Sequence, residues 1–277
     1  MPTTIPSVST FTNANLALPF DPARNPSQAV SAWLTRDIVR GVFAPLEKLR
    51  AQHLSDFYKV GYNPIREGII HLASTGLVVH EHQKGYRAAP VSLEDYEDVA
   101  EIFVRVYRMA LGMALKRGDQ AWEERVVVRL HRLLRVQKAD SADPEVYEMW
   151  QRAYNDLHYE MLSGCGSPVL FKLARDVGAR AERYVNLFSD REIDPQQDSQ
   201  SEHRAIVDAL IARDSDGLRA LIGLHFSTGP MSDSIRDALM RREGRAPLRR
   251  ARTKSPSATD LGKGRGRRPK ELATRST

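Results

Sequence analysis

The sequence predicts a mainly α-helical fold: an N-terminal winged helix-turn-helix of three helices plus a β-hairpin wing, an all-α helical bundle, and a disordered basic tail. Three observations predict it. Within residues 34–90, short helical patterns precede two strand-like segments around a turn. Residues 91–240 hold further helical patterns with short connections, which favour a bundle. Residues 241–277 are rich in charge and poor in apolar side chains, so they cannot build a core.

The first domain begins with two short amphipathic patterns. Apolar positions at helical spacing predict helices over residues 32–40 and 52–58. Asn63 and Pro64 predict the N-cap and first position of a third helix that ends near Ser74, because an N-cap oxygen satisfies a free amide and proline lacks one. The hairpin follows, with strands predicted over 77–80 and 86–89 around a turn over 82–85.

The bundle is predicted to start where Ser92 precedes Glu94 and Asp95, which is a typical helix N-terminus, and its first helix should end at Gly118. Apolar residues recur at helical spacing in the segments that follow. The six predicted helices cover 92–118, 120–136, 144–162, 168–188, 199–213 and 215–226.

Charge divides the chain in the same way. The net charge is +6, but residues 241–277 carry 13 Lys+Arg against 3 Asp+Glu, while residues 91–240 carry a net −7. An acidic body is unsuited to lying on a polyanion, so the middle of the chain should have another role. The predicted parts are a flexible N-terminal arm over 1–27, the winged helix-turn-helix over 28–91, the helical bundle over 92–242 and the basic tail over 243–277.

Length and composition are compatible with a two-domain protein of the cytoplasm. The chain has 277 residues, of which 42% are hydrophobic. Its one cysteine, Cys165, excludes an internal disulfide framework and suits a reducing compartment, where it is expected to be a small buried residue. No apolar run is long enough to span a membrane, and the start lacks a basic region followed by an apolar core.

The first domain resembles a known family. The segments LTRDIVRGVFAP, LRAQHLSDFYKVGYNPIREGIIHLASTGLV and KGYRAAPVS resemble, in order, the DNA-binding domain of GntR-family bacterial transcription regulators. Ile65, Ile69 and Leu72 should pack inward, which leaves the N-terminal end of the third helix exposed to meet base edges. The resemblance therefore implies a double-stranded DNA operator as partner.

Individual contacts follow from the same segments. Arg66 maps onto a base-reading arginine, whereas Tyr62 stands where the family usually has arginine, which implies an altered operator. Gly85 maps onto the glycine of the wing, although a tight turn alone also explains it. Arg66 in turn could be a solvated residue paired with an acid, but a cation in the first helical turn opposes the macrodipole, which favours a function. The predicted DNA contacts are Arg50, Tyr62, Asn63, Arg66, Lys84 and Gly85.

Three histidines from three predicted bundle helices are candidate metal ligands. Imidazoles on different helices of a bundle can converge in its core and bind zinc or a similar divalent ion, although scattered helical histidines are usually hydrogen-bonded or surface residues. VSLEDYEDV, LHYEMLSGCGSPVL and EHRAIVDALIARD followed by LIGLH are similar to the FCD effector domain of one GntR branch, which implies a metal held by His158, His203 and His225. Tyr154 occupies the position where that branch usually has an acidic ligand.

The resemblance also implies a small effector, a carboxylate or an amino-acid-related metabolite. A guanidinium grips a carboxylate bidentately, which makes arginines candidates for the pocket, though each is equally explained as a solvated or ion-paired residue. Tyr154, as a neutral phenol, is expected to cap the pocket or bond the effector. The predicted effector-pocket residues are Arg105, Arg108, Tyr154 and Arg183.

The tail contains the segment GRGRRPK, which is similar to the AT-hook, a minor-groove element. Arg265, Arg267 and Arg268 are its predicted contacts, and even a nonspecific polycation would strengthen DNA binding by counterion release. Together these features predict a homodimeric, metabolite-controlled transcriptional repressor that is not an enzyme. The alternatives are a metal-dependent hydrolase built on the three histidines and a nonspecific architectural DNA-binding protein.

Overall fold

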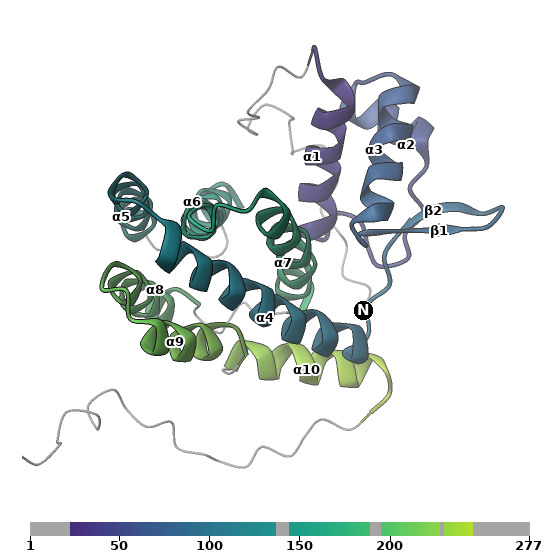
Figure 1. Cartoon of the computed structure of the whole chain (residues 1–277). Helices are drawn as coiled ribbons and strands as arrows, with labels where there is room; N and C mark the ends of the chain where they lie inside the picture. The colour runs from purple at the N-terminus through teal and green to yellow at the C-terminus, as the bar shows by residue number, and fades with distance from the viewer. Residues whose placement is uncertain (1–22, 137–143, 189–194, 228–229, 246–277) are drawn as a thin grey trace, which may run out of the picture.

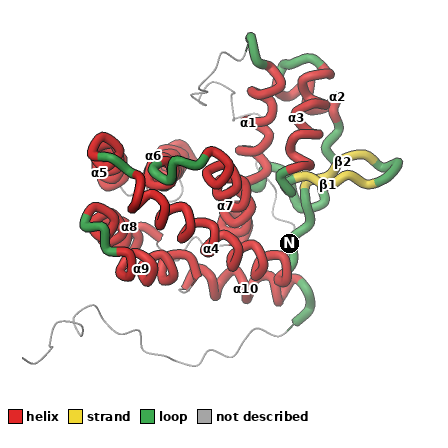
Figure 2. Tube along the Cα trace, in the orientation of Figure 1, coloured by secondary structure: helices red, strands yellow, loops and turns green. Residues whose placement is uncertain are grey.

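The computed structural model of the chain describes residues 23–136, 144–188, 195–227 and 230–245. Figure 1 shows an N-terminal unit of three helices and a hairpin beside a bundle of the later helices. Figure 2 shows that strands occur only in the hairpin within the described part of the chain, so the predicted mainly α fold is confirmed. Residues 1–22 of the predicted arm and all three predicted AT-hook arginines lie outside the described residues.

The N-terminal unit has the predicted order of elements. Its two strands pair antiparallel, with Val78 opposite Ala88 and Glu81 opposite Gly85. The elements are α1 (Pro26–Val39), α2 (Ala51–Tyr58), α3 (Tyr62–Ser74), β1 (Val78–Glu81) and β2 (Gly85–Ala88).

In the N-terminal unit, two helix starts differ from prediction by two residues or more. α1 begins at Pro26, six residues before the predicted start, and Pro26 occupies the first turn, where a missing N–H costs no intrahelical bond. α3 begins at Tyr62 with Gly61 as its N-cap, so the prediction that Asn63 caps this helix is wrong. Lys59 turns the chain with a φ of 55°, and Pro64 is accommodated because the first four amides of a helix need no carbonyl within it.

The core of the N-terminal unit lies between α1 and α3. Ile65, Ile69 and Leu72 are at most 2% exposed, which confirms the predicted inner face of α3. At Gly68 the two helices approach so closely that a Cβ would lie 2.5 Å from a methyl carbon of Val30. Close approach therefore requires glycine at this position, and α3 is held rigidly with its other face outward.

Among the described residues, the bundle contains one more helix than predicted. Figure 1 shows the long α4 at its centre, and α4 packs against α6, α7, α9 and α10. The helices are α4 (Leu93–Arg117), α5 (Gln120–Arg135), α6 (Pro144–Ser163), α7 (Pro168–Phe188), α8 (Pro195–Ile211), α9 (Ser215–Ser227) and α10 (Pro230–Arg242).

The helix α10 was not predicted because its buried apolar residues are few. Ile235, Leu239 and Met240 pack with Tyr96 and Tyr184 in a small cluster between α4, α7 and α10. The rest of α10 is polar, with serines, aspartates and arginines. Its position is thus decided by contacts with distant helices more than by a strong periodic pattern of its own.

The start of α4 is fixed by the predicted cap. Ser92 Oγ accepts a hydrogen bond from the Asp95 amide at 3.1 Å, and Glu94 and Asp95 add negative charge in the first turn. We expect Ser92→Ala to lower the free energy of unfolding by about 1 kcal/mol. Chemical denaturation measures this change. Ser163→Ala, at the C-terminal end of α6, is the control. An unchanged midpoint for Ser92→Ala would contradict the role of the cap.

Within the described residues, no helix is both long enough and apolar enough to cross a membrane.

Candidate functional site

The outer face of α3 carries the predicted base-reading residues. Tyr62 is 51% exposed, and Asn63 and Arg66 are also exposed in the first turns of the helix. Because the opposite face is buried against α1, these side chains project away from the protein. A helix that is rigidly packed on one side and polar on the other can enter the major groove of DNA.

The other predicted contacts flank this helix. Arg50 is exposed at the N-cap position of α2, and Lys84 is exposed in the turn of the hairpin. Gly85 has a φ of 88°, which L side chains rarely adopt, and a Cβ there would meet nothing within 4 Å. Backbone conformation, and not crowding, therefore requires glycine at the hairpin turn.

The three predicted metal ligands converge inside the bundle. His158 from α6, His203 from α8 and His225 from α9 each offer a ring nitrogen, and these atoms lie within 4.8 Å of one another. The Nε2 atoms of His158 and His203 are 3.0 Å apart. His203 is fully buried and His158 is 5% exposed, so the cluster is shielded from solvent.

Two neighbouring side chains orient these rings. The Tyr107 hydroxyl lies 2.5 Å from His158 Nδ1, and Glu202 Oε2 lies 2.8 Å from His225 Nδ1. With Nδ1 engaged in this way, Nε2 of both rings is left for the centre of the cluster. Carboxylate and hydroxyl partners behind a ligating histidine fix its tautomer and orientation in metal sites. Neither Tyr107 nor Glu202 was predicted, although Glu202 is adjacent in sequence to His203.

The electrostatics of the cluster favour a neutral imidazole at His158. Burial, together with the nearby His203 and His225, holds the pKa of His158 well below its usual value. The hydrogen bond to His225 lowers the pKa of Glu202, which therefore remains a carboxylate. Neutral imidazole is the form that binds a metal ion.

Tyr154 packs against all three histidines of the cluster. Its ring centroid is 4.2 Å from that of His158 and 5.3 Å from that of His203, and its hydroxyl is 3.5 Å from His225 Nε2. A phenol is a poor anionic ligand at neutral pH. The residues present thus offer three nitrogen donors, which fit zinc or a similar divalent ion and leave a coordination position for a further ligand.

The predicted pocket arginines contact other groups. Arg105 pairs with Glu101 on the exposed face of α4. Arg108 donates to the Arg219 carbonyl at 2.8 Å, and Arg183, which is buried, donates to the Ala89 carbonyl at 2.8 Å. None of these contacts is with the histidine cluster.

Comparison with known proteins gives two matched families. Residues 26–87 match the bacterial regulatory proteins of the gntR family, and residues 98–228 match the FCD domain. The chain is 30% identical to the HTH-type transcriptional repressor GlaR of Escherichia coli (strain K12), over 71% of this chain and 90% of that protein. It is 29% identical to the uncharacterized HTH-type transcriptional regulator BphR of Paraburkholderia xenovorans (strain LB400), over 76% of this chain and 86% of that protein.

Solved structures share the fold. A structure of E. coli McbR/YncC covers 72% of this chain and 92% of its own, with a TM-score of 0.63 and 16% identity. A putative GntR transcriptional regulator from Rhodococcus sp. RHA1 covers 79% of this chain and 98% of its own, with a TM-score of 0.56 and 22% identity. The relatives are transcription regulators and not enzymes, which removes the hydrolase alternative. The chain belongs to the GntR family of bacterial transcription regulators and carries an FCD domain behind its DNA-binding domain.

Proposed function

We propose that this regulator is a homodimeric repressor that binds a pseudo-palindromic operator and releases it when a small carboxylate or amino-acid-related metabolite occupies the FCD domain. The observation that carries the proposal is the pairing of an outward-facing α3, with Arg66 exposed, and a buried convergent histidine cluster in one chain. The relative GlaR is named a transcriptional repressor, which supports the sign of the response. Its place of action is the bacterial cytoplasm.

The two domains are joined by contacts through which a signal can pass. Asn186 on α7 donates to the Val39 carbonyl at the end of α1 at 3.0 Å, and Arg183 on the same helix holds Ala89 after the hairpin. A change in the position of α7 would therefore move the DNA-binding domain relative to the bundle. Such coupling is typically about 1 to 3 kcal/mol, and it requires that the effector bind the two arrangements with different affinity.

For the histidine site we propose a zinc or similar divalent ion held by His158, His203 and His225. Such an ion, when bound, would act as a Lewis acid and accept an electron pair from a carboxylate oxygen. We expect Tyr154 to line the part of this site where the effector binds, because its ring packs on His158 and its hydroxyl faces His225. An effector carboxylate then replaces the acidic ligand that the family usually supplies from the protein.

We expect the carboxylate of Glu202 to orient His225 and not to bind the ion itself. Glu202→Gln should weaken metal affinity about tenfold to a hundredfold, because an outer partner of a ligating histidine is lost. Competition with a chromophoric chelator measures the affinity. Glu124→Gln, an exposed position on α5, is the matched control and should leave it unchanged. Equal metal affinity of Glu202→Gln and the unaltered protein would remove this role.

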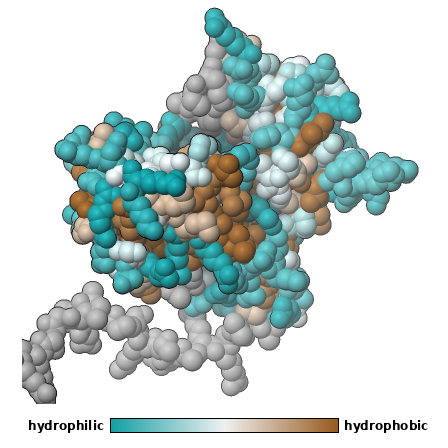
Figure 3. Space-filling model, viewed as in Figure 1, coloured by the Kyte–Doolittle hydropathy of each residue, from teal (hydrophilic) through white to brown (hydrophobic). Residues whose placement is uncertain are grey.

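Dimerisation is supported by the surface of the bundle. Figure 3 shows apolar surface gathered on the face where α4 and α7 lie. Exposed apolar side chains on these helices include Ile102, Met109 and Val169, which are 39%, 60% and 81% exposed. Large contiguous apolar patches mark interaction sites, and a two-fold dimer would match the two half-sites of a palindrome. Sedimentation equilibrium distinguishes a dimer from a monomer.

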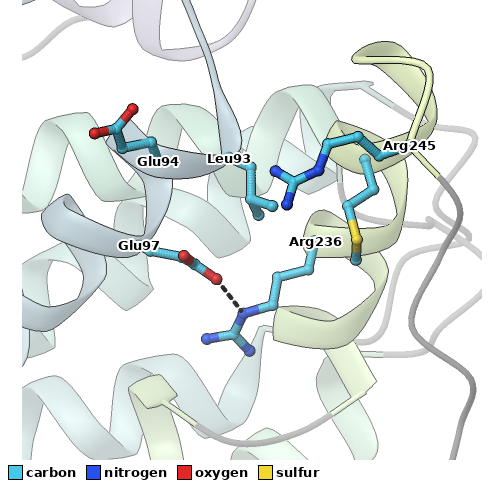
Figure 4. Close-up of a pocket in the computed structure, with 6 residues that line it drawn as sticks. Leu93, Glu94, Glu97, Arg236 and Arg245 are labelled. Carbon is cyan, nitrogen blue, oxygen red and sulfur yellow. Dashed lines mark ion pairs between the residues drawn. The ribbon is translucent and has the colours of Figure 1, made fainter.

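The last described residues of the chain lie beside the start of α4, which follows the DNA-binding domain. Glu243 accepts a hydrogen bond from the Leu93 amide at 2.8 Å, and Arg236 lies 3.6 Å from Glu97 (Figure 4). The basic tail is thus attached beside the start of α4, immediately after the wing. This placement supports a proposed auxiliary minor-groove contact by Arg265, Arg267 and Arg268.

Deletion of residues 246–277 tests that contact. We expect weaker DNA binding and a shallower dependence of affinity on salt, because fewer counterions are released, while selectivity for the operator persists. Fluorescence anisotropy at several salt concentrations measures both quantities. If the deletion abolished all DNA binding while the DNA-binding domain remained folded, the nonspecific architectural alternative would gain support over recognition by α3.

The effector proposal is tested by a thermal-shift screen of the full chain against small carboxylic and amino acids. A ligand that binds only the folded protein raises its melting temperature. A compound that stabilises the protein should also dissociate it from a duplex of its own upstream region. If no compound shifts melting and none alters DNA binding, control by such a metabolite is excluded.

A further inference from the structure

A cleft lies between the DNA-binding domain and the bundle. This cleft has a volume of about 640 Å³ and is lined by α1 and the end of α3 on one side and by α6 and α7 on the other. Its size is within the range of small-molecule sites, about 300 to 1,000 Å³. His158, His203 and His225 do not line it, so it is distinct from the histidine cluster.

Two residues that line the cleft, one from each domain, carry a buried polar atom that lacks a hydrogen-bond partner among the described residues. Arg36, on α1, donates from Nε to Asp37 Oδ1 at 2.6 Å, but its buried Nη2 has no acceptor. Gln151, on α6, donates from Nε2 to Glu182 Oε1 at 2.6 Å, but its buried Oε1 has no donor. Gln151 is only 6% exposed. Buried groups of this kind are rare and call for an explanation such as a ligand.

The surrounding charges fix these two side chains in place. Arg40 and Arg152 both pair with Oε1 of Glu148, at 3.2 and 3.3 Å. Glu182 accepts hydrogen bonds from Gln151 and from Asn155, so the Gln151 amide nitrogen is committed and its oxygen faces elsewhere. Arg36 cannot turn away without losing its bond to Asp37. Both unpartnered atoms are therefore preorganised.

The remaining wall offers a surface for a carbon skeleton. Arg175 lies over the Tyr159 ring, with 4.9 Å between the guanidinium carbon and the ring centroid, and also lies over Phe171 at 5.9 Å. Aromatic rings beside a few fixed polar groups are the usual lining of a small-molecule site.

We propose that this cleft binds a small organic acid that also carries a hydroxyl or amino group: its carboxylate accepts from Arg36 Nη2, and its hydroxyl or amino group donates to Gln151 Oε1. A guanidinium selects an anion, whereas an amide oxygen selects a donor, so one molecule must offer both. Because Arg36 belongs to the DNA-binding domain and Gln151 to the bundle, the bound acid holds the two domains together. The site is separate from the one proposed at the histidines, because none of the three histidines lines the cleft.

Calorimetric titration of the full-length protein tests the cleft, with L-malate and L-glutamate as probes. Propionate, which has the carboxylate without the second donor, should bind more weakly than either. We expect Arg36→Lys and Gln151→Leu each to raise the Kd of the better probe at least tenfold, since a hydrogen bond to a charged or buried group is lost. Arg125→Lys, at an exposed arginine on α5 that does not line the cleft, is the control and should leave the Kd unchanged.

Chelation separates this site from the histidine cluster. Dialysis against a chelator should leave the Kd unchanged, because no histidine of the cluster lines the cleft. Loss of binding on chelation, equal Kd values in Arg36→Lys and the intact protein, or no binding of either probe at millimolar concentration would each overturn the proposal. If both variants unfold, a crystal structure of the intact protein with the better probe decides: density between Arg36 and Gln151 supports the site, and density elsewhere contradicts it.

Discussion

Replacing His203 with alanine is expected to abolish stoichiometric metal binding and to lower the thermal stability of the protein. His203 is fully buried, and its Nε2 lies 3.0 Å from that of His158. Without it, two nitrogen donors remain, which is too few for a closed zinc site. A ligand present at about a hundred times its Kd stabilises the folded state by about 2.7 kcal/mol, and this contribution would be lost.

Elemental analysis of protein purified without chelator, combined with melting in the presence and absence of EDTA, measures both effects. His131→Ala is the matched control, because His131 is exposed on α5 and should retain the metal. EDTA should lower the melting temperature of the intact protein and of His131→Ala, but not of His203→Ala. Finding no stoichiometric divalent ion in the intact protein, with His203→Ala equally stable, would eliminate the metal site.

Replacing Arg66 with alanine is expected to remove most of the selective affinity for the operator. Arg66 is exposed on the outward face of α3, whereas Ile65 and Ile69 fix the opposite face in the core. A base-reading arginine contributes about 1 to 3 kcal/mol at each site, so a dimer that uses two copies loses correspondingly more. Competition binding with operator and scrambled duplexes measures the change.

The control variant has the same net charge as Arg66→Ala. Arg132→Ala also removes one exposed cation, but from α5 in the bundle, and should leave operator affinity unchanged. If Arg66→Ala bound as tightly and as selectively as the intact protein, α3 would not be the base reader.

Strong periodic patterns with clear ends were sufficient to predict most helices. The bounds of α7 match the prediction at Pro168 and Phe188, because proline starts this helix and its apolar stripe is continuous. By contrast, α10 was missed, since few of its residues are apolar and its burial depends on α4 and α7. The start of α3 was misplaced because the backbone of Gly61, and not the side chain of Asn63, precedes the helix.

The candidate site was predictable where ligand chemistry was visible in the sequence. Three histidines on separate helices do converge, as expected of a bundle core. The partners Tyr107 and Glu202 were not predicted, because which group stands behind a ring depends on tertiary packing. Contacts of arginines were unpredictable for the same reason: Arg108 and Arg183 bind backbone carbonyls that no sequence pattern indicates.

The central claim is that the regulator recognises a specific DNA sequence through α3 and the wing. Selection of bound duplexes from genomic fragments, followed by titration at physiological salt, tests it most directly. We predict enrichment of an inverted repeat whose affinity exceeds that for unrelated duplexes by about a thousandfold or more. Affinity that is the same for every sequence and depends only on salt would contradict the account.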